Sequence, residues 1–416
     1  MDKTKPFVIS KRAVWDAYLK VRANKGGAGV DEQSLTQFEQ DLQGNLYKLW
    51  NRLSSGSYFP PPVKLVEIGK KGGGVRPLGV PTVADRIAQT VVAGELEKVV
   101  EPIFDDDSYG YRPGRSAHDA LAICRQRCWE FDWAVDLDVK AFFDSVDHQL
   151  MLKAVAWHTD QRWILLYVER WLKAPLQQRD GTLVERDRGT PQGSAISPVL
   201  ANLFLHYAFD SWMRRTFPSV PFERYADDAI AHCTSLAQAE QVQEAIRQRL
   251  VECGLQLHPD KTRIVYCKDA NRPGSHEHES FDFLGYTFRP RLAKNKDGQY
   301  FVSFLPAVSK AAAKAKRQEI RRWRLHLWTN KSLQELAAFM NPIVRGWINF
   351  YGRFYRSWLI ITVLQQINQY LIRWAMRKYK RLRGSRRKAT RFLARVARSD
   401  PELFAHWRLV RPAGAG

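Results

Sequence analysis

Two groups of aspartates stand out because their spacing could hold divalent cations. Asp136 and Asp138 lie two residues apart in the stretch 133–139, where apolar and polar side chains alternate. Asp227 and Asp228 are adjacent between two apolar stretches, as at a hairpin turn. Adjacent carboxylates repel each other and become favourable when divalent cations lie between them. Three carboxylates from two neighbouring strands could hold the pair of metal ions used in nucleotidyl transfer.

An adjacent pair of aspartates can also be no more than a solvated turn, and an isolated pair favours that interpretation. Here Tyr225 lies two residues before Asp227, apolar stretches flank the pair, and the strand that carries Asp138 lies upstream. These three features together favour a metal site.

The elements that must hold these acids are those of an α+β protein. Residues 133–139 alternate with period two, which places Val135, Leu137 and Val139 on a buried face and the aspartates on the other. The predicted strands are 63–68 and 75–80, joined by a basic, glycine-rich hairpin tip, then 133–139, a hairpin around 225–228, and β structure around 281–304. The predicted helices are 9–55, 83–101, 116–130, 147–173 and 236–253.

Beyond Pro306 the hydrophobic pattern becomes helical throughout. The predicted helices are 309–328, 332–356 and 358–381. Ser332 and Glu335 have the spacing of a capping box, which would open the second of them. Charge and period both change near residues 291–308, and this change predicts a domain border there.

Positive charge is concentrated at the C-terminal end of the sequence. The 416 residues have a formal net charge of +22. Residues 291–416 hold 28 Lys and Arg against 5 Asp and Glu, a net of +23, so residues 1–290 carry −1. Twelve basic residues and no acidic one lie between Arg373 and Arg398, with aromatic residues interleaved. Nucleic acid is the usual partner of such a surface, and a merely solubilising tail is the alternative.

The composition argues against several other classes of protein. The five cysteines are an odd number without a Cys-x-x-Cys pair, which argues against disulfides and a cysteine-rich zinc module and indicates reduced thiols in the cytoplasm. The polar, basic start lacks the apolar core of a secretory signal. The apolar run 358–364 is too short to span a bilayer, so we expect no membrane partner.

Five sequence blocks, in order along nearly the whole chain, resemble those of the reverse transcriptases of group II introns. They are Arg76-Pro-Leu-Gly-Val-Pro81 with Asp85-Arg86, Ser108-Tyr-Gly-Tyr-Arg-Pro-Gly-Arg-Ser-Ala-His-Asp119, Asp138-Val-Lys-Ala-Phe-Phe-Asp144, Thr190-Pro-Gln-Gly-Ser-Ala-Ile-Ser-Pro-Val-Leu-Ala-Asn-Leu-Phe-Leu-His206 and Tyr225-Ala-Asp-Asp228. The resemblance implies a right-hand polymerase with fingers and palm, followed by an all-helical thumb/maturase domain. It also implies an RNA-directed DNA polymerase that uses two Mg²⁺ ions.

The resemblance assigns roles around the incoming nucleotide. Asp138 and Asp227 would be catalytic metal ligands, and Asp228 would be a metal-site carboxylate that is less directly bound. Asp136, one pleat away from the family position, would be solvated. Phe143 would be the ring that excludes a 2′-hydroxyl, with a core aromatic as the alternative. The other predicted dNTP contacts are Lys70, Arg76, Gln192 and Lys261, although Gly69 stands before Lys70 where the family usually has proline.

The resemblance also implies contacts with nucleic acid. Arg112 and Arg115 would contact the template backbone, with ion pairs to residues 105–107 as an equal alternative. Gly285 would belong to the primer grip. Residues 346–351 are similar to the thumb/maturase domain, which follows the primer–template and binds structured intron RNA. The basic residues that would extend this RNA contact are Arg381, Arg383, Arg386, Arg387 and Lys388.

These assignments predict four parts of the chain. They are an N-terminal helical extension over 1–60, fingers and palm over 61–290, the thumb/maturase domain over 291–380, and a basic nucleic-acid-binding segment over 381–416. Many relatives carry an HNH endonuclease domain with cysteine pairs, and no cysteine follows Cys267, so we expect no cleavage of the second DNA strand.

The expected partners are an RNA template with a DNA primer, dNTPs and structured intron RNA, and dimerisation stays open. Two alternative functions also stay open. One is a related stand-alone enzyme attached to a retron, a diversity-generating element or a CRISPR array. The other is an RNA-binding maturase, active in splicing alone, whose polymerase site has decayed.

Overall fold

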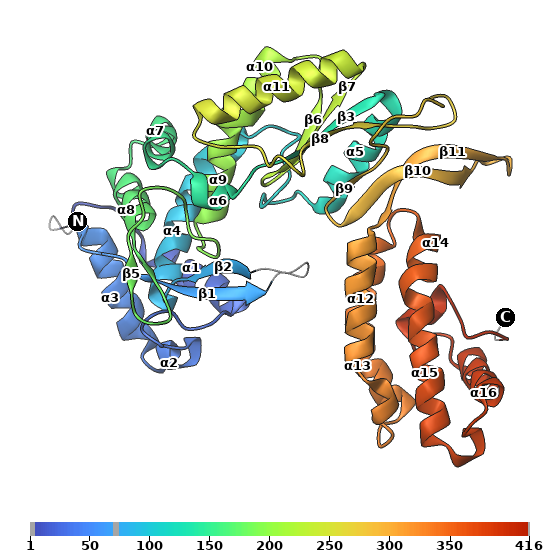
Figure 1. Cartoon of the computed structure of the whole chain (residues 1–416). Coiled ribbons are helices and arrows are strands. Elements are labelled where there is room, and N and C mark those ends of the chain that lie inside the picture. Colours follow the sequence, from blue (N-terminus) through green and yellow to red (C-terminus); the bar gives the residue numbers. More distant parts are fainter. Residues whose placement is uncertain (1–4, 70–74, 415–416) are drawn as a thin grey trace. The chain divides into compact units, whose positions relative to one another are not determined.

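The computed structural model describes residues 5–69 and 75–414 (Figure 1). The chain forms two compact units, the first made of Met1–Ala120 and Val135–Ile264, the second of Leu121–Ala134 and Val265–Gly416. The boundary predicted at residue 290 lies inside a strand of the second unit, and the four-part division stays a prediction.

The N-terminal region is helical, as the sequence predicts, but it forms three helices. They are α1 (Lys11–Asn24), α2 (Leu35–Gln40) and α3 (Leu42–Ser55). Helix α1 ends where Lys25 and Gly26 take positive φ angles of 58° and 114°. Ser34 and Gln37 form a reciprocal capping box that starts α2.

The predicted hairpin is confirmed as β1 (Val63–Gly69) and β2 (Val75–Val80), which pair antiparallel from Lys64↔Val80 to Gly69↔Val75. The hairpin tip, and with it the predicted dNTP contact Lys70, lies outside the described residues. Two short strands, β4 (Leu176–Gln177) and β5 (Leu183–Val184), complete a sheet of order β2-β1-β4-β5. Helix α4 (Val83–Val100) follows the hairpin.

A second sheet carries the aspartates. Its strands are β3 (Trp133–Asp138), β6 (Phe222–Tyr225), β7 (Asp228–Cys233) and β8 (Arg263–Tyr266), in the order β6-β7-β3-β8. Val135 and Leu137 are buried, as predicted, but Ala134 on the other face is fully buried as well, so both faces of this strand are largely covered. Helix α11 (Leu236–Glu252) packs against β7 (Figure 1). The remaining helices of the first unit are α6 (Phe142–Ser145), α7 (His148–His158), α8 (Arg162–Lys173), α9 (Ser197–Leu205), the π turn η2 (His206–Asp210) and α10 (Ser211–Thr216).

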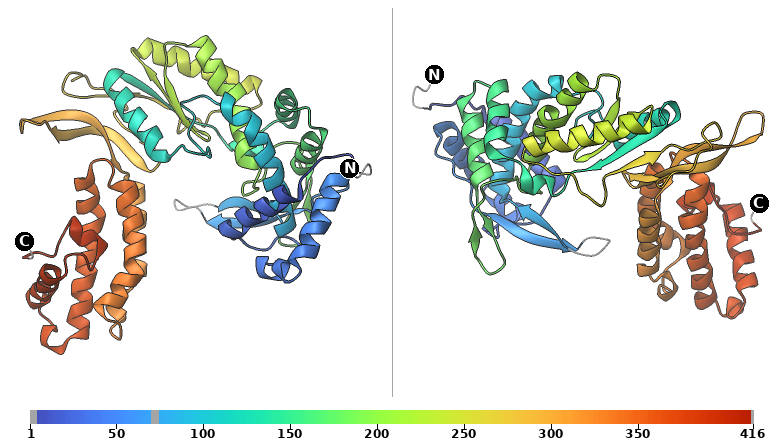
Figure 2. Two further views of the ribbon diagram at one scale, coloured as in Figure 1. Left: turned by 180° about the vertical axis from the view of Figure 1, so that it is seen from behind. Right: turned by 45° about the horizontal axis from the view of Figure 1, so that its top comes forward.

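The second unit combines a three-stranded sheet with helices (Figure 2). The strands are β9 (Phe281–Phe283), β10 (Tyr286–Lys294) and β11 (Tyr300–Val308), and most of α5 (Ala117–Glu130) belongs to the same unit. The helices after the sheet are α12 (Lys310–Arg322), α13 (Leu333–Tyr351), α14 (Arg356–Leu359), the π turn η4 (Ile360–Leu364), α15 (Gln365–Lys378) and α16 (Arg386–Ser399). The all-helical pattern predicted beyond Pro306 is therefore confirmed, with α16 in addition.

Helix α16 folds into the helical core, although its sequence reads as a basic segment. Ala389, Leu393 and Ala397 are fully buried in the same apolar cluster as Trp374 of α15. The arginines lie on the opposite, exposed face of α16. Within the described residues no helix is both long enough and apolar enough to cross a bilayer.

The last turns of the chain are held by buried amides. Asn341 of α13 donates to the carbonyl of Leu403 at 2.9 Å and accepts from the N–H of Ala405 at 2.8 Å. Asn368 of α15 accepts from the indole of Trp407 and faces His406 Nε2, both at 2.9 Å. His406 is fully buried, and its Nδ1 has no hydrogen-bond partner among the described residues.

We predict that His406 makes the fold acid-sensitive. Burial lowers the pKa of His406 to about 3, so the unfolded chain takes up a proton below about pH 6.5 that the folded chain does not. Stability is therefore lost as the pH falls from about 6.5 toward 3, by about 2 kcal/mol at pH 5. Calorimetric unfolding at pH 7 and pH 5 should show a smaller loss for His406→Gln, which keeps a donor without titrating. An equal loss in both proteins would contradict this.

Candidate active site

The three aspartates lie at the ends of strands that are neighbours in one sheet. Asp138 ends β3, Asp228 opens β7, and Asp227 lies in the two-residue turn between Tyr225 and Asp228, which pair with each other. The first turn residue, Ala226, has a φ of +57°. A positive φ at the first turn position suits the twist of an antiparallel hairpin. The sheet order therefore brings together two groups of acids that are far apart in the sequence.

A buried polar network holds this turn, and sequence reasoning missed it. The fully buried Arg224 donates to the carboxylate of Asp210 at 2.5–2.7 Å and to the carbonyl of Ala226 at 3.0 Å. Asn202 donates to the carbonyl of Gly110 at 2.7 Å. A Cβ on Gly110 would lie 2.4 Å from the backbone nitrogen of Ala226, so only glycine fits against the turn. The one signal in the sequence was the charged pair Glu223-Arg224 between Phe222 and Tyr225 in a short strand.

One cavity of about 680 Å³ is lined by the three aspartates and by three of the predicted nucleotide contacts. Those contacts are Phe143, Gln192 and Lys261. Pro77 and Leu78 of β2 line it as well. The predicted contact Arg76 lies in β2 opposite Ile68. The predicted residues of the nucleotide site thus come from the hairpin sheet, the aspartate sheet, α6, the loop before α9 and the loop before β8.

The clustered negative charge of the three aspartates favours binding of a cation. Burial, together with repulsion from Asp227 and Asp138, raises the pKa of Asp228 to about 7. The ammonium of Lys261 lies 3.1 and 3.0 Å from the two carboxylate oxygens of Asp138. The ammonium of Lys261 thus lies next to the Asp138 carboxylate, where a positive charge is favoured. Clustered carboxylate oxygens are the ligands that hard divalent cations prefer, so the donor set fits such ions.

The prediction that Asp136 is solvated is wrong. Its side chain is only 13% exposed, and Arg263 donates to its carboxylate at 3.4 Å. Burial raises the pKa of Asp136 to about 7, although the charge of Arg263 acts against this rise. The reason is the strand order, because β8 lies beside β3 and brings Arg263 next to Asp136. Strand order is not visible in a single sequence.

The two adjacent phenylalanines have different environments. Phe142 is 1% exposed and packs in the core near Phe204, with ring centroids 6.4 Å apart. Both rings line the cavity, but Phe143 is only half-buried. Phe142 is therefore a core aromatic at the cavity wall, and the role of Phe143 in excluding a 2′-hydroxyl stays a prediction.

The loop over residues 189–198 forms another wall of the cavity. The carbonyl of Gln192 accepts from the N–H of Gly79 in β2 at 2.7 Å. Gly193 has a φ of +108°, and a Cβ there would lie 2.5 Å from the carbonyl oxygen of Gly79. Only glycine at 193 allows the loop and β2 to lie this close.

The prediction that Arg112 contacts the template is wrong. Its side chain is 5% exposed and donates to the Glu101 carboxylate and to the carbonyls of Asp105 and Ser108 at 2.5–2.8 Å. Arg115 pairs with Asp106 at 2.7 Å, which is the alternative left open for it. The guanidinium of Arg112 thus bonds groups inside the protein and is not exposed to a template phosphate.

The remaining predicted nucleic-acid contacts lie in the second unit. Gly285 joins β9 to β10 with a φ of +81°. Five basic side chains near the C-terminal end are exposed, and none of them forms an ion pair with a described residue. They are Arg381, Arg383, Arg386, Arg387 and Lys388. Their roles stay predictions.

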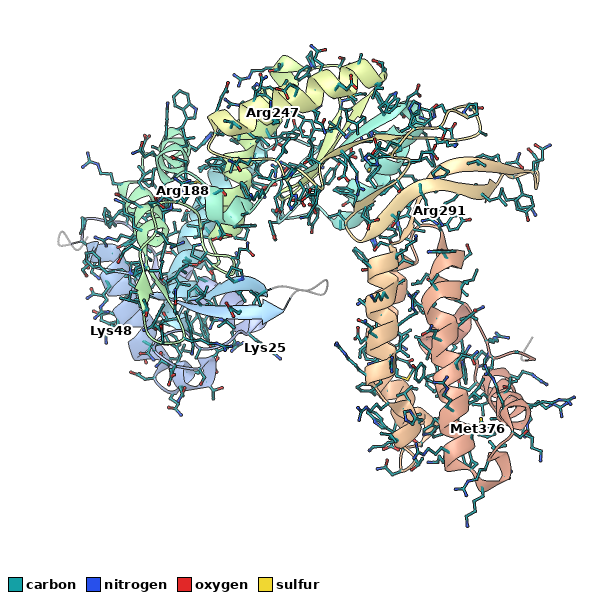
Figure 3. All side chains as sticks on the ribbon, in the orientation of Figure 1. Lys25, Lys48, Arg188, Arg247, Arg291 and Met376 are labelled. Atoms are coloured by element: carbon teal, nitrogen blue, oxygen red, sulfur yellow. The ribbon has the colours of Figure 1, made fainter. Side chains whose placement is uncertain are left out.

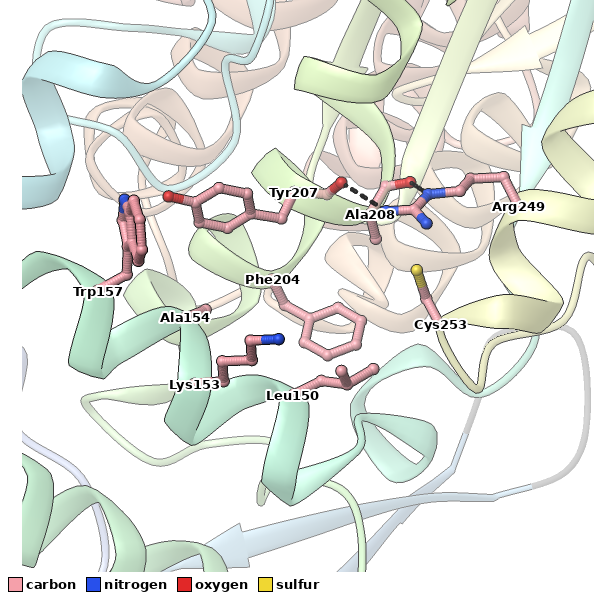
Figure 4. A pocket seen from close by; sticks show the side chains of 9 residues that line it. All are labelled: Leu150, Lys153, Ala154, Trp157, Phe204, Tyr207, Ala208, Arg249 and Cys253. Atoms are coloured by element: carbon pink, nitrogen blue, oxygen red, sulfur yellow. Dashed lines mark hydrogen bonds between the residues drawn. The ribbon is translucent and has the colours of Figure 1, made fainter.

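A second cavity of the first unit, of about 340 Å³, lies between α7, η2 and α11 (Figure 4). Its walls are mainly apolar, and Trp157 at its rim is 80% exposed. Arg249 donates to the carbonyls of Tyr207 and Ala208 at 3.2 and 3.3 Å. None of the predicted site residues lines this cavity.

Two family models match the chain in the order of its domains. The model for reverse transcriptase (RNA-dependent DNA polymerase) matches residues 68–288, which is more than half of the chain. The model for the group II intron maturase-specific domain matches residues 313–393, which include α13, α15 and the start of α16.

Curated relatives agree with these matches. Group II intron-encoded protein LtrA of Lactococcus lactis is 33% identical over 193 residues, which are 46% of this chain and 32% of LtrA. Protein YkfC of Escherichia coli is 31% identical over 298 residues, 62% of this chain and 74% of YkfC. The match thus spans about a third of LtrA and about three quarters of YkfC. The chain belongs to the reverse transcriptase family and carries the maturase-specific domain of group II intron-encoded proteins.

Proposed function

We propose that this protein is the RNA-directed DNA polymerase of a group II intron and that it also binds the intron RNA to assist splicing and mobility. The observation that carries the proposal is the meeting of Asp138, Asp227 and Asp228 at one cavity. The lining of that cavity by Phe143 and Lys261 supports it further. The substrates would be dNTPs and a DNA primer paired with an RNA template.

Two Mg²⁺ ions held by Asp138 and Asp227, with Asp228 beside them, would activate the primer 3′-hydroxyl and neutralise the triphosphate. The side chain of Lys261 is 58% exposed, so its charge can also reach a triphosphate in the cavity. Arg76 would add a second cation from the hairpin. Positive groups stabilise the charge that develops on the leaving pyrophosphate.

The second unit supports the RNA-binding part of the proposal. Residues 291–416 carry a net charge of +23, and the arginines of α16 lie on its exposed face. Because the aspartates belong to the first unit, polymerisation and RNA binding would depend on different residues. We also propose a cytoplasmic location, since the five buried cysteines are thiols outside any disulfide.

Asp227→Ala should abolish primer extension on an RNA template while RNA affinity stays within about twofold. Loss of a metal ligand removes several kcal/mol of transition-state stabilisation, so the rate should fall by about a thousandfold or more. Asp187→Ala is the matched control, because it removes an exposed carboxylate that does not line the cavity. Equal loss of extension and RNA binding would contradict the division between the units. A folded wild type that binds RNA but extends no primer would favour a maturase active in splicing alone.

Phe143→Ala should raise the use of ribonucleotides relative to deoxyribonucleotides by about tenfold or more, because a smaller side chain makes room for the 2′-hydroxyl. The ratio of kcat/KM for rGTP and dGTP measures this change. Phe38→Leu is the control, since Phe38 is a buried ring that does not line the cavity of the aspartates, and its change should lower the Tm without changing that ratio. An unchanged ratio for Phe143→Ala would remove Phe143 from the nucleotide site.

Changing Arg381, Arg383 and Arg387 together to Gln should weaken RNA binding and flatten its salt dependence. Each lost phosphate contact should reduce the slope of log K against log salt by about 0.7–0.9. The control changes Lys98, Lys173 and Arg247 to Gln, which removes the same charge from cations that already pair with Glu95, Glu169 and Glu244. Arg247 lies on the outer side of α11 (Figure 3). Equal slopes for the two triple variants would contradict the proposed RNA contact.

A further inference from the structure

The loop over residues 189–198 is held from three sides. The N–H of Thr190 donates to the carbonyl of Phe143, and the N–H of Gly79 donates to the carbonyl of Gln192, both at 2.7 Å. The third bond runs from the N–H of Ala195 to Oε1 of Gln89 on α4, also at 2.7 Å. The first two bonds join backbone groups. The third depends on one side chain, so a single substitution can remove it.

Gln89 is itself held by a buried aspartate one helical turn earlier. Its Nε2 donates to Oδ2 of Asp85 at 2.9 Å, and the two side chains are 1% and 0% exposed. Oδ1 of Asp85 accepts from the hydroxyl of Tyr58 and from the indole of Trp171, both at 2.7 Å. Every group that faces the carboxylate in these bonds is a donor.

This arrangement determines which way the amide of Gln89 points. A carboxylate only accepts hydrogen bonds, so Gln89 must turn its NH₂ toward Asp85. Its carbonyl oxygen is then the atom that faces Ala195 and accepts from the backbone N–H. The orientation of the amide follows from the donors and acceptors around it.

Packing alone does not require a carboxylate at this position. Burial raises the pKa of Asp85 to about 6, which reflects the cost of placing a charge there. Asparagine would fill the same space without a charge. Its NH₂ could not face Tyr58 and Trp171, because the Trp171 indole is only a donor. The NH₂ of this asparagine would face Gln89 instead, so Gln89 would turn its carbonyl oxygen toward the asparagine. The NH₂ of Gln89 would then face the N–H of Ala195, and two donors would oppose each other.

We propose that Asp85 and Gln89 are positioning residues for the incoming nucleotide, which hold Gly193–Ile196 in one conformation so that Gln192 and Gly193 face the dNTP. The inference rests on the proposed polymerase function. The effect is confined to this segment because Thr190 bonds the hydroxyl of Ser197 at 2.6 Å, and that hydroxyl bonds the carbonyl of Pro191 at 2.9 Å. These two bonds do not involve Gln89.

The test exchanges the carboxylate at position 85 and the amide at position 89. Asp85→Asn alone should turn the Gln89 amide over, and Gln89→Glu alone should oppose two buried carboxylates. The double variant Asp85→Asn with Gln89→Glu restores the pattern, because the introduced asparagine donates to the introduced carboxylate and that carboxylate accepts from Ala195 N–H. The exchange keeps the charge and nearly the volume. Gln89→Met is a milder variant that only removes the acceptor, for use if a single variant does not fold.

The first readout is amide hydrogen exchange at Ala195 in the protein without substrate. The single variants and Gln89→Met should exchange about tenfold faster there, and the double variant should return to the wild-type rate. This readout needs no catalysis, so it tests the network even if primer extension fails. Unchanged exchange in the single variants, or a double variant no slower than they are, would overturn the network.

The second readout is steady-state primer extension. In the single variants the KM for dNTP should rise by about tenfold with a smaller change in kcat, and the double variant should recover. If Asp85 and Gln89 only stabilise α4, the variants lower the Tm and speed exchange along the whole helix while the KM stays constant. That result would overturn a positioning role, whereas absent extension in the wild type would count against the proposed function.

Discussion

Repulsion among three carboxylates at the ends of β3 and β7 is the constraint on which much of the first unit depends. Asp138, Asp227 and Asp228 line one cavity, and the protein does not spread them apart to relieve the repulsion. The raised pKa of Asp228 records this cost. Such an arrangement persists only where the surrounding structure holds it, and it becomes favourable when cations bind.

Buried polar groups supply that support. Arg224, Asp210 and Asn202 hold the hairpin turn, and Gly110 packs against it without a side chain. Buried ions are costly unless every donor and acceptor finds a partner, and here Arg224 satisfies both carboxylate oxygens of Asp210. The network thus buries charged groups, and their hydrogen bonds hold the turn in one defined geometry.

The second unit is built on different principles. Its helices bury an apolar cluster that includes Trp374, Leu393 and Trp407, and they leave arginines on the outside. Amphipathic helix α16 does both at once, since its alanines and leucine pack inward while its basic residues stay exposed. The exposed arginines keep their hydration, but their mutual repulsion destabilises the compact state unless a polyanion is bound.

Much of the protein could be predicted from the sequence because its signals are local. Period-two alternation placed β3, the glycine-rich turn placed the β1–β2 hairpin, and helical periodicity located the helices after Pro306. The aspartates could be chosen because adjacent carboxylates are unfavourable without a cation. The family followed from short blocks whose residues lie close together in the chain.

Only the tertiary structure decided which side chains meet over long separations. Strand order brought Arg263 of β8 to Asp136, and burial withdrew Arg112 from solvent to pair with Glu101. The bond between Gln89 and Ala195 joins residues 106 positions apart. Composition and periodicity report which face of an element is apolar, whereas an ion pair depends on which elements become neighbours. That choice is made by packing of the whole unit, so no single segment contains it.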